Sequence, residues 1–207
     1  MIETAMTIII LFVLAGAVMV FWQFYFLRKP VRKIPIKGIV SPANGKIVKI
    51  IKFGEGKEEH QVPKGMLGKV KVLTSDIAKK GYLIVIMMTP FDVHYQRSPI
   101  NGKVVSVKHQ KGRFLNAVAG ASDMKASLEN EKNTIIIKGK IKVKIIQVAG
   151  FLARRIQSFV IPKQNLYKGE ILGRINLGSQ VILVIPKRKL LVFEGDEVIE
   201  GTTVISE

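Results

Sequence analysis

An apolar stretch near the N-terminus constrains this chain more than any other feature of its sequence. No charged residue occurs from Thr4 to Leu27. As a helix these residues would extend about 36 Å, enough to cross a hydrocarbon core of about 30 Å. Trp22 and Tyr25 lie near the end of the stretch, where aromatic residues meet the membrane interface, and bases follow from residue 28. The sequence therefore predicts a membrane anchor over residues 1–27.

The distribution of charge predicts the orientation of this anchor. By the positive-inside rule, the bases that follow it place residues 28–207 on the cytoplasmic side of the cell membrane. A cleaved signal peptide is the alternative, but such a peptide begins with its basic residues and has a shorter apolar core.

The body of the chain is strongly basic. The chain contains 33 Lys and Arg against 15 Asp and Glu, a net charge of +18, and every base lies between Arg28 and Lys189. Such a body is attracted to a polyanion, and the anchor favours an anionic lipid surface over nucleic acid. The absence of cysteine excludes disulfides, a thiolate nucleophile and a Cys-ligated zinc site, and no metal site is predicted.

Downstream of the anchor, the sequence predicts a mainly β fold. Short runs rich in Ile and Val alternate with Gly, Pro and Asn, and only a few short helices are expected, near residues 111–119 or 151–159. The segment SPANGKIVKI at 41–50 recurs as SPINGKVVSV at 98–107. This repeat predicts a duplicated β-unit of the barrel-sandwich type, with a tight Asn-Gly turn before each strand.

One histidine is a candidate for acid–base chemistry. His94 follows an apolar strand in MTPFDVHYQRSP, two residues after Asp92. Residues i and i+2 of a strand share a face, so the carboxylate and the imidazole could form an oriented pair. The alternative is a buried histidine whose ring is satisfied by the local backbone. His60 and His109 are expected to be ordinary loop residues without a functional partner.

A second candidate is the dipeptide Gly178-Ser179, which stands directly before the apolar run QVILVIP. Taken alone, it is typical of a turn at the start of a buried strand. Motifs of metalloproteases, α/β-hydrolases and nucleotide-binding proteins are absent from the sequence.

Read together with His94, this dipeptide gives the chain a family resemblance. The chain resembles the phosphatidylserine decarboxylase proenzyme family, and within it the short form that includes archaetidylserine decarboxylases. The motifs that carry the resemblance occur in order from about residue 40 to residue 207: SPANGKI, TPFDVHYQRSPINGKV, GRFLNA, ENEKNTI, QVAGFLARRI, INLGSQVILVIP and GDEVIEGTTVI. Each motif is weak alone, but the ordered set behind a membrane helix is specific.

The resemblance implies a self-cleaving proenzyme that makes its own covalent pyruvoyl cofactor. The Ser179 hydroxyl would attack the carbonyl of Gly178 to form an ester. Elimination and hydrolysis would then release ammonia and leave a pyruvoyl group at residue 179. The two chains, 1–178 and 179–207, would stay associated by strand pairing. The pyruvoyl ketone would form a Schiff base with the serine amine of phosphatidylserine or archaetidylserine and accept the electrons left by CO2.

The resemblance also implies roles for other side chains. His94 would protonate the carbanion, with Asp92 orienting its ring. Arg154 and Arg155 are candidates for binding the lipid phosphodiester or the serine carboxylate. A solvated basic face near the membrane is the alternative for these two arginines.

Two positions depart from the family pattern and bear on self-cleavage. The family's first repeat reads A-D-G with an aspartate implicated in processing, where this chain has Asn44. Larger relatives carry a second histidine three positions after the first, where this chain has Arg97. Three alternatives follow: His94 serves both steps, deamidation of Asn44 restores an acid, or the chain stays an uncleaved proenzyme.

Two other classes of function compete with the enzyme. A membrane-anchored lipoyl/biotinyl-like adaptor would use the Gly-centred motifs only as hairpin turns, although Lys187 and Lys189 lack the setting of a modified carrier lysine. A basic nucleic-acid-binding domain would show steep salt dependence and no lipid reaction. Exposed edge strands are compatible with a homodimer.

Overall fold

The computed structural model describes residues 2–54, 59–63, 69–111, 113–114, 128–129, 131–149, 155–176 and 180–207. Most of their regular structure is strand, which confirms the mainly β class. Within these ranges, helical residues occur only at the N-terminus. The expected helix near residues 151–159 is wrong where it can be compared, because Ile156–Ser158 form a strand. Of the other expected helix, residue 111 is coil, 113–114 form a strand, and the rest lies outside the described residues.

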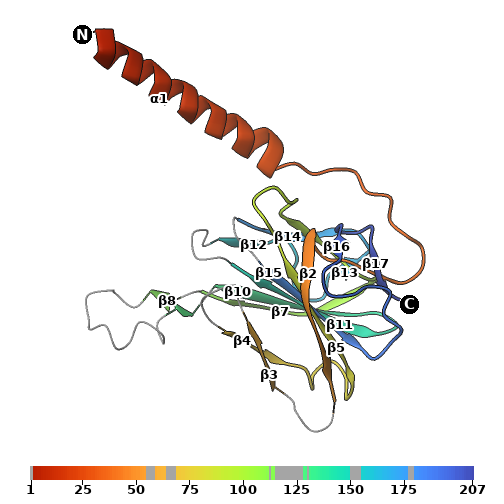
Figure 1. The fold of residues 1–207 in the computed structure, drawn as a ribbon. Coiled ribbons are helices and arrows are strands. Elements are labelled where there is room, and N and C mark those ends of the chain that lie inside the picture. Colours follow the sequence, from red (N-terminus) through yellow and green to blue (C-terminus); the bar gives the residue numbers. More distant parts are fainter. Residues whose placement is uncertain are drawn as a thin grey trace, which may run out of the picture.

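The N-terminal helix stands away from the β body over most of its length (Figure 1). Helix α1 (Ile2–Val20) continues into a π-helical turn, η1 (Phe21–Phe26). The segment Glu3–Phe26 is long and apolar enough to cross a membrane. Large apolar side chains such as Phe12 are exposed on it, as expected for a surface that meets lipid rather than a protein core.

An antiparallel sheet of eight strands forms the body. The order of strands across it is β13 (Asn165–Leu166), β7 (Gly102–Gln110), β10 (Lys132–Lys138), β11 (Lys142–Val148), β15 (Gln180–Pro186), β5 (Gly81–Met87), β2 (Gly45–Phe53) and β16 (Glu197–Val198). The sheet curls around the main core (Figure 1).

Smaller sheets complete the body. The three-stranded sheet has the order β12 (Ile156–Ser158), β14 (Ile171–Ile175) and β6 (Tyr95–Arg97). The two-stranded pairs are β1 (Ile39–Val40) with β17 (Val204–Ser206), β3 (Glu59–Pro63) with β4 (Lys69–Leu73), and β8 (Arg113–Phe114) with β9 (Leu128–Glu129).

The central strands are buried on both faces, which explains their continuous apolar runs. On β5, Ile84 and Ile86 point into the main core, whereas Leu83 and Val85 point into a second core covered by the β3–β4 hairpin. Strands β11 and β15 alternate in the same way. A strand covered on both faces needs apolar residues at every position, so it loses the alternating pattern of a half-exposed strand.

The two S-P-x-N-G-K motifs occupy equivalent places in the fold. Strands β2 and β7 each begin at the glycine of their motif and run for nine residues. The hydroxyls of Ser41 and Ser98 each donate to the carbonyl two residues ahead, at 2.7 Å. The copies also exchange reciprocal backbone hydrogen bonds, Val40 N to Pro99 O at 3.1 Å and Arg97 N to Pro42 O at 2.9 Å.

A segment from the C-terminal part of the chain pairs with the start of each repeat strand. Strand β16 pairs with the start of β2, and β13 pairs with the start of β7. The turn before β16 contains Gly195 at φ 101°, and the corresponding turn before β13 contains Lys163 at φ 74°. Lys163 is the one non-glycine residue with positive φ in the described ranges, at a place where its counterpart uses glycine. This matched pairing confirms the predicted duplication.

The linker from the helix to β1 crosses between the two repeats. Ile34 contacts Gly169 and Gly201, which occupy matching positions in the two C-terminal segments. Lys168 Nζ donates to the carbonyl oxygens of Ile36 at 2.9 Å and Gly38 at 3.1 Å. The linker is therefore held on the body, which places the end of the helix relative to the sheet.

Candidate active site

Four of the sequence motifs meet at one end of the curled sheet. Strand pairing aligns Lys46 with Met87, Met87 with Gln180, and Gln180 with Val148. These four residues form a single row across β2, β5, β15 and β11. The starts of β2 and β15 therefore lie beside the ends of β5 and β11.

The candidate residues are on the segments that extend from this row. Asn44-Gly45 precedes Lys46, and the backbone of Gly45 passes so close to the Met87 carbonyl that a Cβ would collide with it. Residues 88–94 follow β5 and end at His94, whereas residues 177–179 precede Gln180. Gly178 and Ser179 themselves lie outside the described residues, as does Arg154 on the segment after β11.

His94 lies on the loop that connects β5 to β6, and its side chain is fully buried. Its Nδ1 lies 2.8 Å from the carbonyl oxygen of Asp92. A carbonyl only accepts, so Nδ1 carries the proton and Nε2 of the neutral ring has a free lone pair. Nε2 is buried and has no hydrogen-bond partner within the described parts of the chain. A buried ring nitrogen with no partner is available to a group that the structure does not contain.

The backbone of His94 ties it to the strand that leads towards Ser179. Its carbonyl oxygen accepts a hydrogen bond from Ile175 N, at 3.2 Å. Ile175 ends β14, and Asn176 is the last described residue before position 180. Like His94 Nε2, the Oδ1 atom of Asn176 is buried without a partner among the described residues. The end of β14 and the loop hydrogen-bonded to it thus each carry a buried polar atom without a partner among the described residues.

The predicted contact between the Asp92 carboxylate and the His94 ring is wrong. Asp92 lies in a turn before β6, not on a strand, so the two side chains do not share a strand face. The carboxylate instead accepts hydrogen bonds from Thr89 N at 2.6 Å and Thr89 Oγ1 at 2.8 Å. Asp92 contacts the His94 ring through its backbone carbonyl, which the side-chain pattern could not indicate.

The environment of His94 keeps its ring neutral. Burial lowers the pKa of His94 from 6.5 to about 4. The hydrogen bond to the Asp92 carbonyl and the negative charge of Asp92 oppose this shift, and the positive charges of Arg28 and Arg174 add to it. At neutral pH the ring is therefore a base with its lone pair on Nε2.

A chain of buried amide side chains supports His94 from behind. Asn133 Nδ2 donates to Gln147 Oε1 at 2.8 Å, and Gln147 Nε2 donates to Gln96 Oε1 at 2.7 Å. Gln96 Nε2 then donates to the His94 carbonyl at 2.8 Å. All four residues are fully buried. Sequence reasoning missed the three amides, although Gln147 follows two isoleucines within β11, which is an unusual place for a polar residue.

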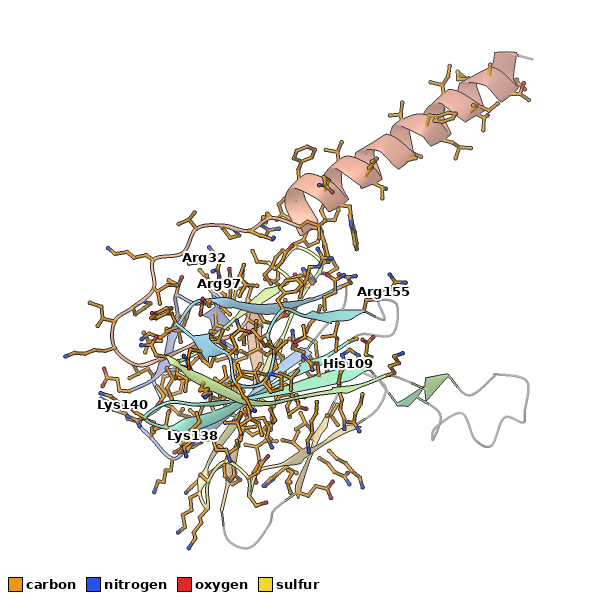
Figure 2. The ribbon with its side chains drawn as sticks, turned by 180° about the vertical axis from the view of Figure 1, so that it is seen from behind. Arg32, Arg97, His109, Lys138, Lys140 and Arg155 are labelled. Carbon is orange, nitrogen blue, oxygen red and sulfur yellow. The ribbon has the colours of Figure 1, made fainter. Side chains whose placement is uncertain are left out.

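Arginines lie close to this site. Arg174 on β14 donates from Nη1 to the Tyr95 hydroxyl at 3.3 Å and from Nη2 to Gln157 Oε1 at 2.8 Å. Sequence reasoning did not single out Arg174. Arg155 is exposed, and its carbonyl accepts from Asn176 N at 3.2 Å, so its backbone lies beside the same segment. Figure 2 shows Arg155 well apart from Arg32 and Arg97.

Asn44 has a structural role in its turn. Its Oδ1 accepts a hydrogen bond from Glu200 N at 2.8 Å. The equivalent Asn101 in the second repeat accepts from Lys168 N at 2.6 Å. An aspartate at position 44 would offer the same acceptor, so this departure from the family pattern keeps the turn intact. Its effect on self-cleavage stays a prediction.

Arg97 holds the linker onto the body. It donates to the Gly169 carbonyl at 2.8 Å and to the Pro30 carbonyl at 3.0 Å. Its Nε lies 3.7 Å from Glu200 Oε1, and the fully buried Glu200 carboxylate also accepts two hydrogen bonds from Arg32, at 2.8 and 2.9 Å. Figure 2 shows Arg32 and Arg97 close together on the linker side. A part for Arg97 in processing stays a prediction.

His109 is not a residue without a partner, as the sequence suggested. It lies on β7, and its Nε2 is 2.9 Å from Glu131 Oε1. The same carboxylate oxygen accepts from Ile156 N at 3.1 Å. His109 therefore helps to fix the start of β12, which the 21 residues between His109 and Glu131 hid from sequence reasoning.

Comparisons with known proteins place these features in a wider context. The family model described as phosphatidylserine decarboxylase matches residues 21–206. A phosphatidylserine decarboxylase proenzyme of Carboxydothermus hydrogenoformans is 37% identical over 186 residues, which cover 87% of this chain and 77% of the relative. One of Saccharopolyspora erythraea is 34% identical over 197 residues, covering 93% and 75%. A protein of Methanothermobacter thermautotrophicus, whose assigned name is that of an archaetidylserine decarboxylase proenzyme, is 41% identical over 128 residues, covering 61% and 55%.

Proposed function

The chain belongs to the phosphatidylserine decarboxylase proenzyme family of carboxy-lyases, and from this premise we propose that it converts a serine phospholipid to the ethanolamine phospholipid and CO2. The observation that carries the proposal is the buried His94 ring. Its unpaired Nε2 lies on a loop that is hydrogen-bonded to the strand leading to Gly178-Ser179. The substrate is phosphatidylserine or its ether-linked archaeal counterpart, archaetidylserine.

The cofactor in this proposal is a pyruvoyl group made from Ser179 when the bond to Gly178 is broken. The residues around this position fit such a group, because His94 Nε2 and Asn176 Oδ1 are buried polar atoms without partners in the described structure. The group supplies a ketone conjugated to an amide, which takes up the electron pair left when CO2 departs.

His94 moves a proton in this scheme. Because burial keeps its ring neutral, Nε2 first accepts a proton, and the substrate's ammonium group is the donor that must lose one before its nitrogen can act as a nucleophile. The resulting imidazolium then returns a proton to the carbon that has lost CO2. The Asp92 carbonyl holds Nδ1–H throughout, so the ring keeps Nε2 aimed at the reacting atoms.

The charged parts of the lipid headgroup require cations. Arg174 and Arg155 lie beside the segment before Ser179, and Arg28 and Lys29 come from the linker side. Lys29 Nζ lies 4.8 Å from the centre of the Tyr95 ring, the same ring that Arg174 contacts. Guanidinium groups bind phosphodiester and carboxylate oxygens well, so these cations bind the headgroup in our proposal, with Arg154 as a further candidate.

The proposal includes the location and the partners of the protein. The N-terminal helix anchors it in the cell membrane, and the basic body faces the anionic cytoplasmic leaflet. The two chains produced by self-cleavage remain paired, exposed edge strands offer a route to a homodimer, and nucleic acid is not a partner. A non-catalytic adaptor would not require a buried histidine that has an unpaired ring nitrogen and is supported by a chain of buried amides.

The mass of the purified protein tests the proposal. We expect the wild-type chain to yield a fragment that starts at residue 179 with a pyruvoyl block, and to release CO2 from vesicles that contain phosphatidylserine or archaetidylserine. The Ser179→Ala protein is expected to remain one chain of 23.0 kDa and to release no CO2. Ser106→Ala, on the half-buried part of β7, is the matched control and should behave as wild type.

Two results would contradict the proposal. One is full turnover by the Ser179→Ala protein. The other is lipid-active mature protein that carries an unmodified serine at position 179. Comparing the two lipids in the same vesicles identifies the preferred substrate.

A further inference from the structure

The end of the membrane helix packs directly on His94. Phe26 is fully buried, whereas the other described side chains of the segment Glu3–Phe26 are half-buried or exposed. The centre of its ring lies 4.1 Å from that of the His94 ring, and the ring planes meet at 33°. Trp22 stacks on Phe26, with centroids 4.4 Å apart and planes at 10°. Trp22, Phe26 and His94 thus form one stack that runs from the helix into the body.

A second contact joins the helix to the loop that carries His94. Phe91 lies with its ring centre 6.2 Å from that of Phe21 and 6.5 Å from that of Tyr25, both edge-on. Arg28 bridges the two elements, because it donates to the Tyr25 carbonyl at 2.7 Å and to the Phe91 carbonyl at 2.6 Å. Phe91 directly precedes Asp92, whose carbonyl holds Nδ1 of His94. The helix therefore contacts both the ring and the backbone that orients it.

The helix changes from α-helical to π-helical geometry where these contacts form. Residues 21–26 form a π-helical turn, and Leu27 N donates to Trp22 O at 3.1 Å, a bond that spans five residues. Such turns are rare within α-helices and frequently occur at functional sites. A plain tether would need only a continuous helix and a flexible linker.

We propose that Phe26 is a positioning residue of the active site, and that the end of the membrane helix forms the wall which holds the His94 imidazole and excludes water from it. The helix is then part of the site as well as its anchor. This inference rests on the proposed role of His94, because a wall around that ring matters for activity only if the ring moves protons.

The proposal has a consequence for the titration of His94. Burial is the main cause of its low pKa, and the Phe26 ring covers one of its faces. The charged groups that act on the ring are Asp92 from its own loop, Arg28 from the linker and Arg174 from β14. Removing the Phe26 ring leaves these three charges in place and admits water. The pKa of His94 then rises from about 4 towards 6.5.

The test uses the full chain in lipid nanodiscs with the Ser179→Ala substitution, so that no cleavage or turnover is required. The titration of His94 is followed by NMR of ring-labelled histidine, with the signal assigned by His94→Gln. We expect Phe26→Ala to raise its pKa by one unit or more. Phe24→Ala is the matched control, since Phe24 is on the same turn but 75% exposed, and should leave the titration unchanged.

Two further variants make the test independent of folding defects. Phe26→Leu keeps an apolar cover and should restore most of the low pKa. Trp22→Ala removes the ring stacked behind Phe26 and should give a smaller rise in the same direction, which serves where Phe26→Ala does not fold. In the enzyme with Ser179 intact, the acid limb of the activity profile should shift upward by the same amount as the pKa.

The outcomes separate this inference from the proposed function. A His94 titration that is the same in wild type, Phe26→Ala and Trp22→Ala would overturn the inference, even if the protein decarboxylates lipid. The wild-type protein could instead neither cleave itself nor release CO2 while Phe26→Ala still raises the pKa of His94. That result would support the shielding of His94 by Phe26 and contradict the proposed function.

Discussion

At the scale of single residues, the three buried amides behind His94 stabilise the site only as a connected set. Asn133, Gln147 and Gln96 are fully buried, and each donates to the next acceptor in the chain that ends at the His94 carbonyl. A buried amide without partners costs free energy, whereas a connected series recovers it and restricts the rotamers of every member. The backbone of His94 is therefore set by residues from three different strands.

The amide chain yields a prediction for stability. Gln147→Leu removes the middle member and leaves Gln96 Oε1 and Asn133 Nδ2 without their partners. Each of these two unsatisfied groups costs about 1–3 kcal/mol, so the free energy of unfolding should fall by roughly 2–6 kcal/mol. Urea unfolding in detergent micelles measures this change. Gln61→Leu, at an exposed position on β3, is the control, and an equal effect of the two substitutions would rule out a structural role for the chain.

At the scale of elements, the fold consists of two equivalent β-units with a linker held between them. The units use the same turn, with Asn44 and Asn101 accepting from the backbone of matching residues. They differ in how they hold the linker. Lys168 donates to linker carbonyls, whereas the equivalent Glu200 binds Arg32, an ion pair that joins residues 168 positions apart. The two equivalent residues thus have opposite charges, and both bind the linker.

The buried ion pair gives the prediction at this scale. Glu200→Gln leaves Arg32 and Arg97 without their shared carboxylate, and removing one partner of a buried pair typically costs about 3–5 kcal/mol. We expect the linker to detach, so that trypsin cuts it faster at the exposed Lys33. Rates of proteolysis, followed by mass spectrometry, measure the effect.

A matched substitution shows whether the burial of Glu200 is the cause of faster linker cleavage. Glu59→Gln removes an exposed carboxylate that lies 4.0 Å from Lys71 and should leave the rate of linker cleavage unchanged. If Glu200→Gln is cut no faster than this control, the ion pair does not hold the linker.

At the scale of the whole molecule, the proposed cleavage would leave a short chain at the centre of the fold. Strand β15 is paired along its length with β5 on one side and along most of its length with β11 on the other. Its residues Val181–Ile185 are fully buried between the two cores. The C-terminal part of the same chain adds β16 at one edge of the sheet and β17 against β1.

The central position of β15 in the sheet predicts that the two chains remain together after cleavage. Separating them would expose the apolar faces of β15, and each fully buried Val, Leu or Ile contributes about 1.5–3 kcal/mol. Native mass spectrometry should therefore give the mass of both chains combined, while denaturing conditions separate them. A short chain that is lost during size-exclusion chromatography in native buffer would show that pairing does not retain it.

Local patterns in the sequence were sufficient for the class of the fold and for its duplication. The uncharged stretch up to Leu27 predicted the long apolar helix, the Ile- and Val-rich runs predicted strands, and the motif at 41–50 and 98–107 predicted two equivalent units. These features depend on composition and on spacing over a few residues, which are readable without knowing what lies nearby in space. The motif also singled out His94, whose role in the reaction stays a prediction, and Ser179, with which it was paired, lies outside the described residues.

Tertiary structure alone decided what surrounds the site. The contact of Asp92 through its backbone, the amides behind His94, Arg174 beside Tyr95 and the Phe26 ring over the imidazole could not be inferred from spacing. Most of these contacts join residues that are far apart in the chain, and the Asp92 contact uses an atom that every residue possesses. Burial, and with it the low pKa of His94, is a property of the packed molecule, because it depends on which side chains exclude water from the ring.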